Sequence, residues 1–366
     1  MKSDYQAVSS MLQKHLVHDW WIDDDPQSAE LLARQWSLAG EWVATWLDAH
    51  PSVGQNAVEA AISELTPTEE PTEYLRLTED TFLVVAPGPI GNVFIVSKSN
   101  GHYRLAWTTA QTQEASGEQG KILAAWRAEN ARHGGRGPYA QGFGSAGPVT
   151  PNLGELPSDA KGRARFYIDG NYAQSAGGTE EAQISLWLWD GTTAHLLTAR
   201  AYTFEIEQSV RARLEGDLLK VQQKKFFRTF GSCGPCEERQ TDWVVRITPR
   251  GIEDLGEKSL TPELDAVDKL FYRVIKQKSA ADIAAPAAIE DAASIVQGAK
   301  EEHSEKDWKE YPTLGMIDGW KVEKDAKGEI LCLATDDAGS HLFTLNSIGG
   351  KLFISGIEYT KQDCGK

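Results

Sequence analysis

The sequence has few of the features that mark membrane, secreted or nucleic-acid-binding proteins. None of its apolar runs approaches the ~18 residues needed to cross a bilayer. The start, MKSDYQAVSSMLQ, has no apolar core, so no signal peptide is visible, although a secreted protein whose leader had been replaced by Met would look the same. The sequence has 37 basic and 53 acidic residues, and no basic cluster is longer than Lys224-Lys225. The net charge of −16 repels phosphate, so we expect neither nucleic acid nor an anionic membrane surface as a partner.

Cysteine is also scarce, and four residues permit one or two disulfides without requiring them. Cys233-Gly234-Pro235-Cys236 resembles the redox centre of thioredoxin-type proteins. That family needs the first Cys at the N-terminus of a long helix, where the dipole lowers the thiol pKa. Here strand-like KKFFRTF precedes the motif, only EERQT separates it from the strand DWVVRI, and Ser232 replaces the family's Trp. We therefore expect a turn carrying a disulfide, or a free thiol pair, at Cys233 and Cys236.

Two alternatives for Cys233 and Cys236 stay open, a catalytic redox pair and half of a zinc site. Zinc would require two further ligands, and Cys332 and Cys364 are isolated residues, not a second CxxC.

Other short motifs match known functional patterns, but the residues that flank them do not fit those functions. GFGSAGPV (142–149) matches the GxGxxG pattern but lacks the preceding strand and following helix of a dinucleotide site, so it predicts a flexible surface loop. His15 and His18, with Asp19 and 23–25 nearby, could hold a metal, but His15 lies on an apolar stripe and Asp25 is a helix cap. Ser158 to Lys161 forms an SxxK pattern in a polar turn. We assign no catalytic, cofactor-binding or metal-ligating residue, while a triad assembled from distant positions stays open.

What the sequence does contain is strong periodicity. Residues 1 to about 66 predict helices, with Asp25 as N-cap and Pro26 at the first helical position of the second one. The apolar stripe of that second helix consists of Leu32, Trp36, Ala39, Val43, Trp46 and Leu47. A third helix carries Val58, Ala61, Ile62 and Leu65.

Residues from about 73 to 258 predict strands joined by hairpins. Asn100-Gly101, Asp169-Gly170 and Asp190-Gly191 are hairpin signals, because these residues accept positive φ. In ISLWLW both faces are apolar, which indicates a central strand. The Gly/Pro-rich stretch 133–157 predicts a loop.

The last part of the chain predicts two helices followed by four strands. The first helix follows Thr261 as N-cap and Pro262, and the second starts near Pro286 and ends at Gly298. The strands are MIDGWKVEK, EILCLAT, HLFTLNS and KLFISGIEYT. This order resembles the cystatin-like and NTF2-like folds, and the resemblance implies a curved sheet that wraps a helix, a shape that hosts ligand pockets or dimer interfaces.

The sequence thus predicts an α+β protein in three parts: a helical segment (1–68) packed on a central antiparallel β-meander or sandwich (73–258), and a cystatin/NTF2-like domain (260–366). The favoured function is a non-enzymatic binding or scaffolding protein, bacterial and periplasmic or secreted, with a cytoplasmic location left open. Its partner would be a protein or a small molecule. The alternatives are a hydrolase or isomerase with its site in the C-terminal cone, and a thiol–disulfide redox protein. A C-terminal pocket with a perturbed carboxylate or His would favour the enzyme.

Overall fold

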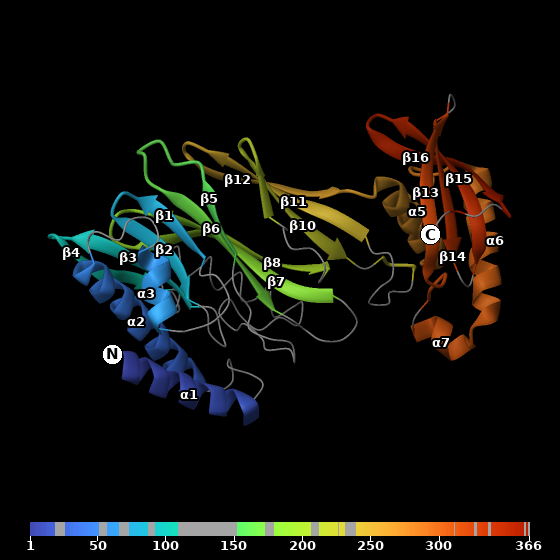
Figure 1. Cartoon of the computed structure of the whole chain (residues 1–366). Coiled ribbons are helices and arrows are strands. Elements are labelled where there is room, and N and C mark those ends of the chain that lie inside the picture. The colour runs from blue at the N-terminus through green and yellow to red at the C-terminus, as the bar shows by residue number, and fades with distance from the viewer. Residues whose placement is uncertain are drawn as a thin grey trace. The chain divides into compact units, whose positions relative to one another are not determined.

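The computed structural model describes residues 1–18, 26–50, 57–65, 73–86, 92–108, 152–172, 179–205, 212–225, 227–230, 239–310, 312–325, 328–335, 338–361 and 364. The chain has mixed α and β structure, and every strand pair with an assigned register is antiparallel. It divides into two compact units, one of residues 1–220 with 245–255, the other of residues 221–244 with 256–366 (Figure 1).

The first unit begins with helices α1 (Lys2–His18), α2 (Pro26–Ala49) and α3 (Ala57–Leu65). A sheet follows with strands in sequence order: β1 (Tyr74–Thr78), β2 (Thr81–Ala86), β3 (Asn92–Ser99) and β4 (His102–Thr108). Helices α2 and α3 cover one face of this sheet (Figure 1), where Val43, Leu47 and Ile62 share a buried core with Val84 and Phe94. The apolar stripe expected for α2 is what this packing requires.

The opposite face of the β1–β4 sheet packs on a second sheet of eight strands. Their order is β12-β11-β10-β8-β7-β6-β5, with β9 paired to β10. The bounds are β5 (Asn152–Leu156), β6 (Arg165–Tyr172), β7 (Thr179–Trp189), β8 (Ala194–Glu205), β9 (Ala212–Glu215), β10 (Leu218–Lys225), β11 (Arg239–Thr248) and β12 (Gly251–Ser259). The shared core includes Leu83 and Ile95 from the first sheet and Phe166 and Trp187 from the second. Strand β7 lies between β6 and β8, so the two-faced apolar run ISLWLW is a central strand, as expected.

The second unit contains α5 (Pro262–Ile275), α6 (Pro286–Glu302), α7 (Glu305–Glu310) and an antiparallel sheet in sequence order. The strands are β13 (Ile317–Asp325), β14 (Gly328–Thr335), β15 (Gly339–Ile348) and β16 (Lys351–Tyr359). Helices α5 and α6 lie against this sheet (Figure 1). The short segment between the helices extends the sheet at one point, because Ile354 of β16 exchanges backbone hydrogen bonds with Ile283 and Ala285.

Several local predictions are confirmed. Asn100 and Gly101 have φ of 54° and 84° and join β3 to β4 as a two-residue hairpin. Gly349 and Gly350 do the same between β15 and β16. Residues 190–193 join β7 to β8, where Oδ1 of Asp190 accepts the backbone N–H groups of Thr192 and Thr193.

Other local predictions are wrong. Asp169 and Gly170 lie inside β6, where Asp169 pairs with Asn152 and Ile184, because pairing with strands on both sides overrides the local turn preference. Part of the stretch predicted as loop is strand β5, which gains its backbone partners from β6. Helix α6 continues past Gly298 to Glu302. By contrast, Thr261 is the N-cap of α5 and Pro262 follows it, as expected, although the Thr261 side chain makes no capping hydrogen bond.

Candidate functional site

The residues that the motifs singled out form no site in the described structure. Cys233, Cys236 and the stretch 142–149 lie outside the described residues, as do Asp19 and 23–25. His15 and His18 belong to helix α1, with side chains that also lie outside the description. Ser158 and Lys161 are exposed in the turn between β5 and β6, in which Asp159 accepts the backbone N–H groups of Lys161 and Arg163. Among the described residues no group of His, Cys, Asp and Glu side chains is arranged to hold a metal ion.

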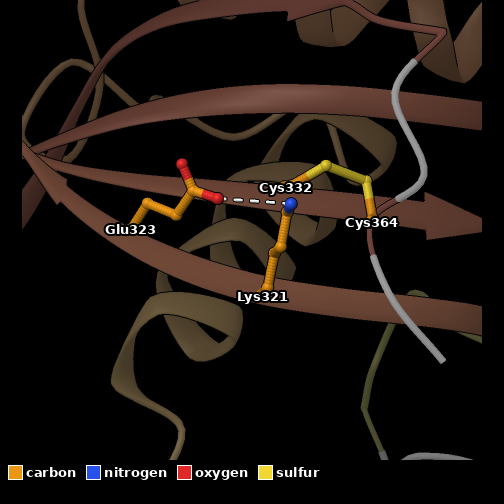
Figure 2. The surroundings of a disulfide bond; sticks show 4 residues. All are labelled: Lys321, Glu323, Cys332 and Cys364. Carbon is orange, nitrogen blue, oxygen red and sulfur yellow. Dashed lines mark ion pairs between the residues drawn. A yellow bond between two sulfur atoms is a disulfide. The ribbon is translucent and has the colours of Figure 1, made fainter.

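A disulfide that sequence reasoning missed joins Cys332 to Cys364 (Figure 2). Cys332 lies on β14, and its Cα pairs with that of Lys321 on β13, whose ammonium forms an ion pair with Glu323 at 3.2 Å. Both cysteines are buried, and 32 positions separate them. Their isolation in the sequence provided no signal for pairing, because only the path of the chain after β16 brings them together.

The second unit contains a pocket between its helices and its sheet, which we name the His341 pocket. It has about 210 Å³ of unfilled space, part of it open to solvent. The lining comes from helices, strands and connecting segments: Phe230, Phe271, Ile295, Leu314, Leu333, Thr335, Ala338, Gly339, His341 and Phe343. All but Thr335 and His341 are apolar or glycine. Most of that space is open to solvent, and the enclosed part has room for about one water molecule.

Aromatic rings connect the pocket to the core and to the surface. Successive ring centroids lie 5.6 to 6.4 Å apart along one path: Phe227, Phe230, Phe271, Phe343, His341 and Tyr359. Most of these pairs have the edge-to-face geometry that the aromatic quadrupole favours. The path ends at Tyr359, whose side chain is 69% exposed.

His341 is the titratable group of the pocket lining. On β15 it pairs with Leu333 of β14 and with Tyr359 of β16. Burial lowers the pKa of His341 below its ordinary value of 6.5, and a hydrogen bond to the backbone of Gly339 opposes that shift. The imidazole is therefore mainly neutral at pH 7.

A buried carboxylate, that of Asp268, fixes the segment that carries Phe230 by hydrogen bonds. Oδ1 of Asp268, on α5, accepts the backbone N–H groups of Arg228 and Thr229 at 2.9 Å and the Thr229 hydroxyl at 2.7 Å. Burial raises the pKa of Asp268, while these hydrogen bonds act in the opposite direction. Asp268 thus attaches the segment before Phe230 to the helix that carries Phe271.

The end of the sheet beside Thr335 and His341 exposes large apolar side chains. Met316 precedes β13 and is 39% exposed, and the neighbouring Ile317 pairs with Thr335 of the pocket lining. Tyr359 ends β16, and its ring lies 3.6 Å from the position that a Cβ on Gly339 would take. Exposed Met and Tyr side chains beside a small apolar pocket are typical of protein-binding surfaces.

The first unit contains two further groups with shifted pKa values, Glu73 and Tyr167, near the buried Asp169. Burial raises the pKa of Glu73, whose Oε2 accepts the Leu153 N–H at 3.2 Å. Burial, and then the charges of Asp169 and Glu73, raise the pKa of Tyr167. Asp169 is 1% exposed, so this cluster belongs to the sheet interior, and we assign no reaction to it.

No protein-family model matches the chain, and no curated protein is similar to it in sequence. Among solved structures, it is similar to an alpha-L-arabinofuranosidase of Fusarium graminearum in complex with an iminosugar inhibitor, with 11% identity, a TM-score of 0.25, and coverage of 52% of this chain and 49% of that one. A GH93 alpha-L-arabinofuranosidase of the same organism, in complex with arabinobiose, has 9% identity and a TM-score of 0.26 over 77% of this chain and 63% of that one. The chain thus spans about half to three fifths of these structures. Similarity this low supports neither a shared fold nor a shared activity.

Proposed function

We propose that this chain is a protein-binding protein whose second unit contacts its partner at the end of the sheet that carries Met316 and Tyr359. The observation that carries the proposal is the exposure of these two side chains, 39% and 69%, because large exposed Met and Tyr side chains are typical of binding surfaces. The Tyr359 ring packs edge-on against His341, and this contact holds it in place.

The strand register supports one contact surface at this end of the sheet. Ile317, next to Met316, pairs with Thr335, and Tyr359 pairs with His341, so the two exposed side chains lie at the same end. In known interfaces a few large side chains supply most of the binding energy, while the neighbouring contacts exclude water. Burying an exposed Tyr and Met together follows that pattern.

The matching experiment uses capped amino acids as probes on the full-length protein. Saturation-transfer NMR should show transfer to the ring of N-acetyl-phenylalaninamide and little to N-acetyl-alaninamide. Met316→Ser combined with Tyr359→Ser should remove the transfer. Ile348→Ser is the matched control, because Ile348 is 59% exposed at the other end of the sheet, where β15 ends. Transfer that survives the double variant, or that is absent from the unmodified protein, would show that this end of the sheet is not the site.

A second candidate function is an enzyme with His341 as general base. The observation that favours it is the lowered pKa of His341, because a neutral imidazole can take a proton at pH 7. Hydrolysis of p-nitrophenyl acetate tests this candidate. A catalytic His341 should accelerate it beyond free imidazole at equal concentration, and His341→Ala should remove the excess. A rate equal to that of imidazole would eliminate this candidate.

We also infer that residues 260–366 form a cystatin-like or NTF2-like domain and that the protein works outside the cytoplasm. The order of α5, α6 and the short α7 before four antiparallel strands supports the first inference. The Cys332–Cys364 bridge supports the second, because disulfides persist in oxidising compartments. Alkylation of the protein from its native cells before reduction should leave both cysteines unlabelled, and labelling would contradict an oxidising location.

A further inference from the structure

The sequence has no long basic run, but the fold of the second unit gathers cations around Tyr272 of α5. Lys269 lies three residues before Tyr272 and Lys276 four residues after it, so these side chains share one stripe of the helix. The Arg228 guanidinium lies 5.0 Å from the centroid of the Tyr272 ring, and the Lys278 ammonium lies 5.4 Å from it. We name this set of four cations the Tyr272 patch: Arg228, Lys269, Lys276 and Lys278.

Backbone hydrogen bonds fix the two cations of the patch that lie outside the helix. The N–H of Arg228 donates to Oδ1 of the buried Asp268 at 2.9 Å, which attaches the segment of Arg228 to α5. After the helix, Gln277 has a φ of 53°, and the N–H of Lys278 donates to the Arg273 carbonyl at 2.8 Å. This is the arrangement of a Schellman C-cap, in which the chain turns back over the last turn of the helix. The turn thus brings Lys278 to the tyrosine ring.

The four cations have little negative charge to balance them. None of them forms an ion pair within the part of the chain that the structure describes. Asp282 binds Arg273 instead, although the charge of Lys269 also lowers the pKa of Asp282. Asp268 is buried, and Asp265 lies one helical turn before Lys269. The patch is therefore a positive area on a chain whose net charge is −16.

The helix dipole accounts for only part of the patch. Cations at the C-terminus of a helix offset its dipole, and Lys276 and Lys278 lie in the right place to do so. Lys269 lies more than one turn before the end of α5, and Arg228 belongs to another segment. These two cations need a different explanation.

The length of the patch suits a short acidic peptide. Lys269 and Lys276 are seven positions apart, which is about 10 Å along a helix. An extended chain covers that distance with about three residues. Arg228 and Lys278 contact the ring of Tyr272, which lies between the two ends of the stripe. A run of about four Asp or Glu residues therefore matches the four cations.

A nucleic acid fits the patch less well. The net charge of −16 repels a long polyphosphate wherever it extends past the patch, whereas a short peptide meets only the patch. Single-stranded nucleic acids also stack their bases on aromatic rings. The Tyr272 ring already has Arg228 and Lys278 against it, so it offers no stacking platform.

We propose that the Tyr272 patch is a docking surface for a short acidic segment of a partner protein. Its carboxylates accept charge-assisted hydrogen bonds from the lysine and arginine side chains. The patch shares no residue with the end of the sheet that carries Met316 and Tyr359, so either surface can bind without the other.

The test measures binding of fluorescein-labelled octaglutamate to the full-length protein by fluorescence anisotropy at low ionic strength. We expect binding that weakens as salt is added, because salt screens exposed charges. Lys276→Gln/Lys278→Gln should weaken it roughly fivefold. Lys300→Gln/Lys306→Gln is the matched control, because it removes two exposed lysines from α6 and α7 and changes the net charge equally. All four lysines are exposed, so both double variants should fold.

Three results would overturn the proposal. One is equal weakening by both double variants, which would show that net charge and not the patch decides binding. Another is an unmodified protein that does not bind octaglutamate, or that binds octaglutamine equally well. The third is tighter binding of an oligothymidylate with the same number of charges, which would assign the patch to nucleic acid. None of these results affects the surface at Met316 and Tyr359, because N-acetyl-phenylalaninamide carries no charge.

Discussion

At the scale of single residues, the second unit depends on polar groups held in places that disfavour charge. His341 and Asp268 are examples, and burial is the largest cause of the pKa shift of each. Their effects on stability have the same physical origin, because in both cases the folded state prefers the neutral form.

Lowering the pH should therefore destabilise the protein through His341. Its folded pKa lies below the unfolded value of 6.5, so the stability that it contributes is present above pH 6.5 and is lost as the pH falls through the folded pKa. The slope for one proton is at most about 1.4 kcal/mol per pH unit. Urea unfolding between pH 7.5 and 5 should show this loss reduced in His341→Phe. His102→Phe is the control, since the His102 side chain is 82% exposed; identical pH profiles for His341→Phe and the unmodified protein would contradict the prediction.

Asp268 should show that its oxygen matters more than its charge. Asp268→Ala removes the acceptor for three donors and should lower the free energy of unfolding by about 2–4 kcal/mol. Asp268→Asn keeps an oxygen and removes a desolvated charge, so it should cost much less at pH 7. Because the pKa of Asp268 is raised in the folded state, the unmodified protein gains stability as the pH falls through that pKa, so the loss caused by Asp268→Asn should be larger at acid pH than at pH 7. Chemical denaturation of the two variants measures this, and equal losses would show that the charge itself is needed.

At the scale of elements, the strands fit together through close approaches that the amino-acid pattern does not reveal. Gly154 of β5 pairs with Tyr167 of β6, and a Cβ on Gly154 would come 1.9 Å from the Tyr167 ring. The ring lies over the glycine and fills the space that a side chain would take. The sequence analysis therefore missed strand β5, because glycine normally indicates a loop, whereas the packing of β5 on Tyr167 requires a glycine at position 154.

Gly154→Ala should destabilise the first unit by about 1–3 kcal/mol, because the tyrosine ring must move. Gly356→Ala, in β16, is the matched control, since nothing lies within 4 Å of the Cβ that it would add. Alanine at that position should be neutral or slightly stabilising. Thermal unfolding of both variants gives the comparison, and a Gly154→Ala protein as stable as Gly356→Ala would disprove the contact.

At the scale of the whole molecule, the chain consists of two units with different means of stabilisation. The first has two buried cores, between helices and sheet and between sheet and sheet. The second has one core and the Cys332–Cys364 bridge. The part of the chain that the structure describes holds no helix long and apolar enough to span a membrane.

Removing the bridge should destabilise the second unit and spare the first. A disulfide that spans 32 positions stabilises by roughly 3–4 kcal/mol in the chain-entropy model. Cys332→Ala/Cys364→Ala should therefore lower protection from hydrogen exchange across α5, α6 and β13–β16 while leaving β1–β4 unchanged. The double variant Cys233→Ala/Cys236→Ala is the control, because it shows how much hydrogen-exchange protection depends on the other two cysteines. Uniform loss of protection in both units would refute the division.

The sequence alone predicted much of the element order, because periodicity and turn residues act over short distances. The stripe of α2, the Asn100-Gly101 hairpin and the four C-terminal strands are examples. Local preference was misleading at Asp169-Gly170, where two neighbouring strands supply backbone partners that override a turn.

The pocket and the disulfide were decided only by the tertiary structure. The aromatic lining residues Phe230, Phe271 and Phe343 come from a loop, a helix and a strand. Cys332 and Cys364 meet only because the chain after β16 returns to β14. Each contact joins residues that no local pattern relates, since what brings them together is the burial of apolar surface across the whole unit. Composition and spacing therefore specified the elements of this protein, and packing over long sequence distances created its candidate site.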